Sequence, residues 1–80
     1  MNQPTIKKEV QNILSNMGIA TKALTPNASF IKDLGLDSLD FAELLIELEV
    51  AFTVEIPVTE AENLRTVQEA VQYINQKINR

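Results

Sequence analysis

The first stretch with a helical pattern of apolar residues runs from residue 5 to residue 17. Lysine, glutamine and asparagine separate its apolar members, which are Ile6, Val10, Ile13, Leu14 and Met17. Apolar residues three and four positions apart form one face of an amphipathic helix. We expect this helix to begin at Thr5, a suitable N-cap, and to stop at Gly18. Residues 1–4 would then be a loose leader.

The longest helical stretch runs from about Ser38 to Phe52 and contains neither glycine nor proline. It is built largely from leucine, isoleucine, alanine and glutamate, a composition that favours a helix. Asp37 lies where an N-cap belongs, and Asp40 lies three residues later near the capping-box position. The sequence therefore predicts a helix whose start is held by two carboxylates.

The acids of this second helix gather on one side. At about 100° per residue, Asp40, Glu43 and Glu47 fall on a single stripe, which we call the acidic ridge. The residues expected roughly opposite, facing a core, are Phe41, Ala42, Leu45, Leu48 and Phe52. Glu43 and Glu47 are like charges four residues apart, which costs roughly a few tenths of a kcal/mol. A penalty of this size is consistent with a surface that recruits partners.

Glu49 departs from the pattern, because by angle it falls on the core side of the helix. We expect it to reach sideways from the helix end into water. The alternative is a structural ion pair with Lys7 or Lys8 of the first helix. Beyond the helix, Pro57 sets a turn.

Residues 19–36 form a long connection, and such connections in small domains are often functional. A turn is expected around Pro26. The connection is also rich in apolar residues, namely Phe30, Ile31, Leu34 and Leu36. We expect these to pin it over the bundle, since together they would otherwise expose a sticky patch. Gly35 is expected to supply a backbone angle that a side chain would resist.

Two capping-box patterns mark later helices. Thr59 with Glu62 predicts a very short helix ending near Asn63, and Thr66 with Glu69 predicts a longer one. The apolar stripe of the longer helix consists of Val67, Ala70, Val71, Ile74 and Ile78. No segment shows the alternation of a strand.

These elements predict an all-α fold, a four-helix bundle with a short third helix and a long loop between helices one and two. Residues 1–80 are expected to form a single domain. With 45% apolar and 22% charged residues, the chain can bury one modest core. We expect a monomer.

The net charge of −4 disfavours nucleic-acid binding, which needs a basic face, and favours partners that carry basic patches. Cysteine and histidine are absent, so no disulfide or thiol ligand is expected. No run approaches transmembrane length and no signal peptide is recognised, which predicts a cytoplasmic protein without membrane insertion. The acids Asp33, Asp37 and Asp40 lack the spacing of a calcium loop, so no metal site is expected beyond weak screening by divalent cations.

Ser38 is the candidate functional residue. In the first turn of a helix its hydroxyl should point outward, where free backbone N–H groups and the positive helix end favour a phosphate. A serine nucleophile needs an adjacent base; the chain has no histidine, and the nearest lysine, Lys32, is expected to be solvated. We therefore expect Ser38 not to be a catalyst, and we expect the chain to have no catalytic residues and not to be an enzyme. Taken alone, Asp37-Ser38-Leu39 would usually mark the start of an ordinary solvated helix.

Residues 33–40 read Asp-Leu-Gly-Leu-Asp-Ser-Leu-Asp, and they are followed by Glu43-Leu44 and Glu55-Ile56-Pro57. This string closely resembles the acyl carrier proteins, and the resemblance continues through residues 27–30 and 66–68. It implies a 4′-phosphopantetheine arm from coenzyme A, esterified to the serine of the Asp37-Ser38-Leu39 motif. Acyl intermediates would be attached to the arm as thioesters.

The resemblance also implies partners: a phosphopantetheinyl transferase, acyl transferases, ketosynthases and other acyl-processing enzymes. Asp40, Glu43 and Glu47 are the expected docking residues. Fatty-acid biosynthesis of the free-standing bacterial type is the expected pathway. The alternatives are a dedicated carrier of a polyketide or other specialised pathway, and an unmodified helical interaction module. Some positions depart from the fatty-acid pattern: Val50, Ala51, Thr53 and Val54 lie where such carriers are often more acidic, and Phe41 lies where the residue is often smaller and polar.

Overall fold

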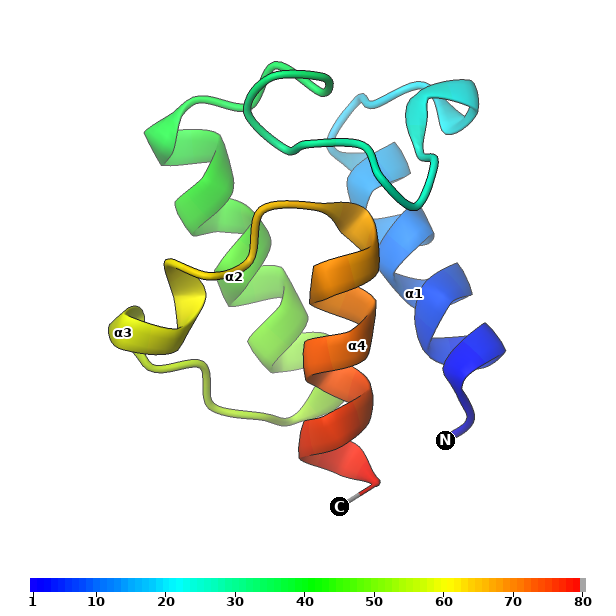
Figure 1. Ribbon diagram of the computed structural model, residues 1–80, viewed down its shortest axis with the longest axis vertical. Helices are drawn as coiled ribbons and strands as arrows, with labels where there is room; N and C mark the ends of the chain where they lie inside the picture. The colour runs from blue at the N-terminus through cyan, green and yellow to red at the C-terminus, as the bar shows by residue number, and fades with distance from the viewer. Residues whose placement is uncertain (80) are drawn as a thin grey trace.

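The computed structural model describes residues 1–79. Its helices, shown in Figure 1, are α1 (Gln3–Asn16), the 3₁₀ turn η1 (Thr21–Ala23), α2 (Ser38–Phe52), α3 (Val58–Ala61) and α4 (Val67–Ile78). Within residues 1–79 there is no strand, and an isolated bridge joins Ser29 to Thr66. The all-α bundle with a short third helix is therefore confirmed. In the same residues, no helix combines the length and apolar character needed to cross a bilayer.

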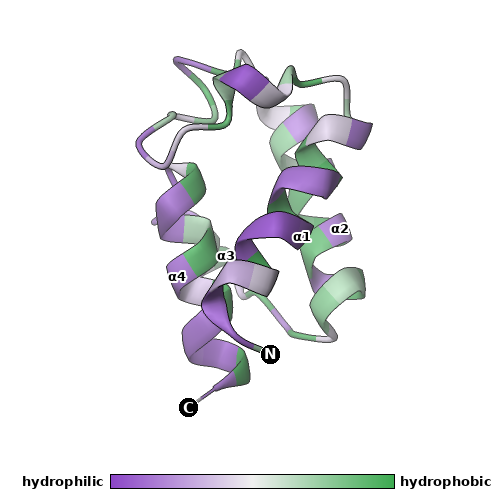
Figure 2. Cartoon of the chain, turned by 90° about the vertical axis from the view of Figure 1, so that its right-hand side faces the viewer, coloured by the Kyte–Doolittle hydropathy of each residue, from purple (hydrophilic) through white to green (hydrophobic). Residues whose placement is uncertain are grey.

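The core lies between α1, α2 and α4, with α1 packing against both of the others. Its largest fully buried side chains are Ile6, Val10, Leu14, Phe30, Leu44, Leu48, Val67 and Ile74. In Figure 2, hydrophilic residues colour much of α1 and α4, whereas hydrophobic residues are prominent along α2. Burial of these side chains contributes about 1.5–3 kcal/mol each relative to exposure, so they carry most of the fold's stability.

The first helix begins earlier than its sequence pattern predicts. Asn2 is the N-cap, and its Oδ1 accepts a hydrogen bond from Thr5 N at 3.0 Å. Pro4 lies in the first turn, where its missing N–H needs no partner. The predicted N-cap at Thr5 and the loose leader are therefore wrong. Gly18 follows the C-cap with a φ of +96°, as expected for a helix stop.

The start of α3 is also predicted incorrectly. Pro57 is the N-cap without a side-chain hydrogen bond, and its carbonyl accepts from Glu60 N and Ala61 N. Thr59 lies inside the helix, so no capping box with Glu62 forms. At α4 the predicted box is confirmed: Thr66 Oγ1 accepts from Glu69 N, and a Glu69 carboxylate oxygen accepts from Thr66 N.

The long connection is pinned to the bundle largely as expected. Phe30 and Leu36 are buried and Leu34 is half-buried, but Ile31 is exposed, contrary to expectation. Gly35 has a φ of +71°, which confirms its predicted role.

Three backbone hydrogen bonds tie the connection to the start of α4. Phe30 N donates to the Arg65 carbonyl at 2.9 Å, and Val67 N donates to the Ala28 carbonyl at 3.1 Å. Gln68 N donates to the Pro26 carbonyl at 2.9 Å. The connection is therefore an ordered part of the fold, because hydrogen bonds attach it to the start of α4, which is distant in sequence.

The buried face of α2 is rotated slightly from the predicted one. Leu48 and Phe52 are buried as expected, and Phe41 and Leu45 are half-buried. Leu44 is fully buried and Ala42 is exposed, which corrects the prediction for Ala42. Burying the larger leucine removes more apolar area from water than burying the alanine would.

Glu49 serves the backbone of the α2–α3 loop. Its Oε2 accepts a hydrogen bond from Ile56 N at 2.9 Å, and the residue is half-buried. Within residues 1–79 it forms no ion pair with Lys7 or Lys8, so both expectations for Glu49 are wrong. The carboxylate satisfies a backbone donor that the loop would otherwise leave unpaired.

Candidate functional site

The start of α2 is held by a complete capping box. Asp37 is the N-cap and its Oδ1 accepts from Asp40 N at 2.8 Å, while Asp40 Oδ2 accepts from Asp37 N at 3.3 Å. Phe41 N donates to the Asp37 carbonyl at 2.9 Å and begins the helical ladder. The predicted cap is confirmed, and it fixes the backbone on the helical side of Ser38.

The loop before Ser38 is fixed as firmly. Leu36 is buried, and its N–H donates to the Phe30 carbonyl at 2.9 Å. Farther back, Asp33 Oδ2 accepts from Ser29 N at 2.7 Å, which closes a tight turn. Ser38 is the first residue of α2, and it therefore lies between the anchored loop before it and the capped first turn after it.

The Ser38 side chain is exposed, and within residues 1–79 no protein group hydrogen-bonds its hydroxyl. The N–H groups of Ser38 and Leu39 lie in the first turn and are likewise without a protein acceptor. The carboxylates of the box are turned onto backbone donors, and the helix end is positive. The position can therefore accept a phosphate ester on the hydroxyl, with free N–H groups beside it.

General-base activation of Ser38 from within the chain has no support. The chain contains no histidine. In the described residues neither a hydrogen bond nor an ion pair joins Lys32 to Ser38, and Lys32 is exposed. In residues 1–79 the Ser38 hydroxyl is thus exposed and has no basic side chain hydrogen-bonded to it.

The acidic ridge runs down α2 from the turn that contains Ser38. Glu43 and Glu47 are exposed and Asp40 is half-exposed, all on one side of the helix. The structure thus brings the predicted docking residues onto one face. In residues 1–79 no cluster of three or more carboxylates comes close enough to hold a metal ion.

An exposed apolar stripe lies beside this ridge and was missed by the sequence reasoning. Leu39 is 77% exposed, Ile46 58% and Val50 74%. These residues are seven and four positions apart, so they share one face of the helix. The signal was present in their spacing, but an apolar helix residue is usually assigned to the core.

A small apolar pocket lies beside Phe41, and we call it the Phe41 pocket. Its volume is about 170 Å³, and it is lined by Phe30, Ile31, Phe41, Ala61, Glu62, Leu64 and Arg65. The rings of Phe30 and Phe41 are tilted at 48° with centroids 5.9 Å apart. Phe41 lies one turn along α2 from Ser38, so the pocket is within reach of a group attached there.

A family model described as a phosphopantetheine attachment site matches residues 8–74. The chain belongs to this family. It is therefore a phosphopantetheine-dependent carrier, such as an acyl carrier protein, and the resemblance noted in its sequence is confirmed. The cofactor of the family is 4′-phosphopantetheine, bound covalently, and carrier domains present it to the enzymes that modify the carrier and process its cargo.

Asp37→Ala is expected to destabilise the carrier by about 1 kcal/mol, because it removes the N-cap of its longest helix. Asp37→Asn retains a side-chain oxygen for Asp40 N and is the matched control. Urea unfolding followed by circular dichroism measures both variants. Equal stability of Asp37→Ala and Asp37→Asn would show that the capping box contributes nothing.

Proposed function

We propose that the protein carries acyl intermediates of type II fatty-acid biosynthesis on an arm attached to Ser38. The observation that carries this proposal is the exposed Ser38 hydroxyl at a capped helix start, which has no protein hydrogen-bond partner within residues 1–79. Asp37 and Leu39 would assist attachment of the arm. Asp37 holds the first turn of α2, and the free N–H of Leu39 would lie beside the phosphate of the arm. We further propose that residues 1–80 act as one monomeric domain in the cytoplasm.

Partner docking is assigned to the exposed side of α2. The acidic ridge would attract the basic patch of a transferase, acyl transferase or ketosynthase. The apolar stripe beside it would give such a partner a contact that desolvates on binding. Because both begin near Ser38, a partner gripping them would have the attached arm directed toward its own active site.

The arm's thiol supplies the thioester chemistry, and the chain's own residues would shelter the acyl group. The Phe41 pocket is an apolar space whose lining includes Phe41, one helical turn from Ser38, and each methylene buried there gains about 0.8 kcal/mol. Ala42 and Ile46 are exposed, so they do not line an interior space for the cargo. Phe30 and Phe41 take that place in the proposal.

Incubation with coenzyme A and a broad-specificity phosphopantetheinyl transferase tests this function. The intact mass should rise by one phosphopantetheine group, because one exposed acceptor serine is proposed. An unmodified interaction module would show no mass change, and that result would overturn the carrier assignment.

A specialised pathway is the second candidate, because Val50 and Phe41 make the docking side less acidic than the fatty-acid pattern. We expect a fatty-acid malonyl transferase and ketosynthase to accept the carrier, though less well than a more acidic one. Turnover should be compared with a Phe41→Thr, Val50→Glu, Ala51→Glu variant. Improved turnover by the variant would favour a specialised carrier, whereas equal and efficient turnover of both would favour fatty-acid synthesis.

A further inference from the structure

The short helix α3 has little to hold it in place. It contains four residues, its N-cap Pro57 makes no side-chain hydrogen bond, and its buried residue is Ala61. Its first residue, Val58, is exposed. A helix of this length is unstable in water by itself, because too few hydrogen bonds offset the cost of nucleation. Its position therefore depends on contacts with the rest of the bundle.

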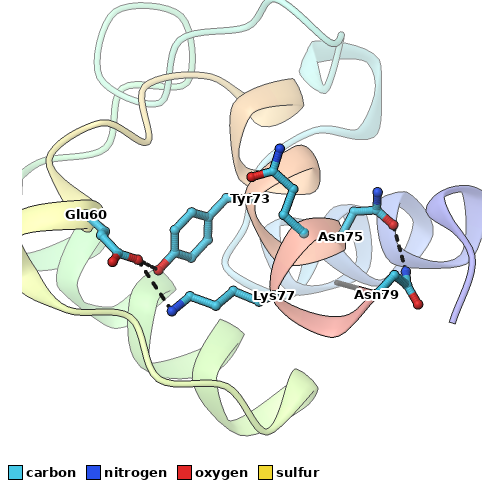
Figure 3. A pocket seen from close by; sticks show the side chains of 6 residues that line it. Glu60, Tyr73, Asn75, Lys77 and Asn79 are labelled. Atoms are coloured by element: carbon cyan, nitrogen blue, oxygen red, sulfur yellow. Dashed lines mark hydrogen bonds and ion pairs between the residues drawn. The ribbon is translucent and has the colours of Figure 1, made fainter.

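A polar cluster joins α3 to α4. Glu60 of α3 accepts a hydrogen bond from the hydroxyl of Tyr73, and Lys77 Nζ lies 3.5 Å from Glu60 Oε1. Lys77 Nζ also lies 5.5 Å from the centroid of the Tyr73 ring. Figure 3 shows Tyr73 and Lys77 extending from α4 to the same carboxylate. We call these three residues the Glu60 clamp.

The same short segment forms a wall of the Phe41 pocket. Ala61 and Glu62, at the end of α3, line the pocket together with Phe30 and Phe41. The segment thus has the Glu60 clamp on one flank and an apolar space on the other. Any outward movement of α3 widens that space.

We propose that Tyr73 and Lys77 are positioning residues, which hold α3 where it closes the Phe41 pocket over a short acyl chain. This inference rests on the proposed function for its cargo, although the clamp itself does not. With the clamp intact, water is kept from an acyl group in the pocket. When the clamp is broken, α3 moves away from the pocket more often and the acyl chain is exposed to water.

Amide hydrogen exchange of the protein before loading tests the clamp. Tyr73→Phe removes one hydrogen bond and keeps the ring, so the Ala61 and Glu62 amides should exchange about threefold to tenfold faster. The core amide of Leu48 reports global unfolding and should change less. Gln72→Ala, on an exposed position of α4, is the control for substitutions in that helix. Unchanged exchange at Ala61 and Glu62 in Tyr73→Phe would overturn the clamp.

Two further variants separate the contributions to the clamp. Glu60→Gln keeps an acceptor for Tyr73 and removes the charge beside Lys77, so exchange in α3 should rise less than in Tyr73→Phe. Lys77→Met keeps the aliphatic stem and removes the ammonium, and it should match Glu60→Gln. If either variant increases amide exchange in α3 more than Tyr73→Phe does, the Tyr73 hydrogen bond is not the main contact of the clamp.

Thioester cleavage by hydroxylamine tests the link to cargo. The hexanoyl form should be cleaved more slowly than the acetyl form. The ratio of the acetyl cleavage rate to the hexanoyl cleavage rate should fall about twofold or more in Tyr73→Phe, if α3 opens as often as the exchange indicates. An unchanged ratio despite faster exchange in α3 would overturn the link to the pocket. A protein that is never loaded would overturn the proposed function and leave the exchange result standing.

Discussion

Ser38→Ala is expected to abolish attachment of phosphopantetheine. The substitution removes the acceptor oxygen, and no other group of the site can take its place. It should leave the fold intact, because within residues 1–79 the Ser38 side chain makes no hydrogen bond and alanine favours a helix. The change in unfolding free energy should stay within about 0.5 kcal/mol. Intact-mass measurement after the transferase reaction gives the result directly.

Ser15→Ala is the matched control for this experiment. Ser15 is also exposed and helical, but it lies at the end of α1 and far from a helix start. Its removal should leave the mass increase unchanged. A mass increase that persists in Ser38→Ala would show that another residue accepts the arm.

Charge reversal on the acidic ridge is expected to slow loading by about tenfold at low ionic strength. Glu43→Lys and Glu47→Lys each replace attraction toward a basic partner by repulsion, and such contacts act mainly on the association rate. Each substitution also turns a like-charge pair into an opposite-charge pair on α2, so helix stability should not fall. The ratio kcat/KM for the transferase should be measured from low to high salt. The difference from wild type should shrink as salt increases.

Glu9→Lys on α1 makes the same change of net charge away from the ridge. Glu9 is exposed and lies on a different helix, so this variant should be loaded at close to the wild-type rate. Wild-type kcat/KM for both ridge variants at low salt would refute the docking assignment. An equal loss in Glu9→Lys would assign the effect to net charge alone.

Elements with local signals were predicted well from the sequence. The start of α2 depends on Asp37 and Asp40, which lie within one turn of each other, so their spacing was sufficient. The comparison of Thr59 with Thr66 shows where such a signal fails: the box forms at Thr66 but not at Thr59. At Thr66 the backbone is held by the bridge to Ser29, whereas the start of α3 is already decided by Pro57. The sequence contains two similar capping-box patterns, and it does not show at which of them the backbone adopts the conformation that a capping box requires.

Contacts between distant segments were the part that the sequence did not reveal. Glu49 was assigned to water or to a lysine because its partner, Ile56 N, meets it only after the loop turns back. Ala42 was assigned to the core and the buried Leu44 was not, because the helical wheel does not show how far α2 is rotated toward α1. The assignments of Ser38 and of the acidic ridge remain predictions.

The hydrogen bonds between the long connection and α4 have a consequence for the order of events during synthesis. Residues 26–30 are made well before residues 65–68, and these are the segments whose backbones pair. Domains fold as units while the chain emerges from its N-terminus. Until residues 65–68 have left the ribosome, the connection lacks these bonds, and Ser38 follows a segment that is not yet ordered. The native surface around Ser38 is therefore completed only when the start of α4 has emerged.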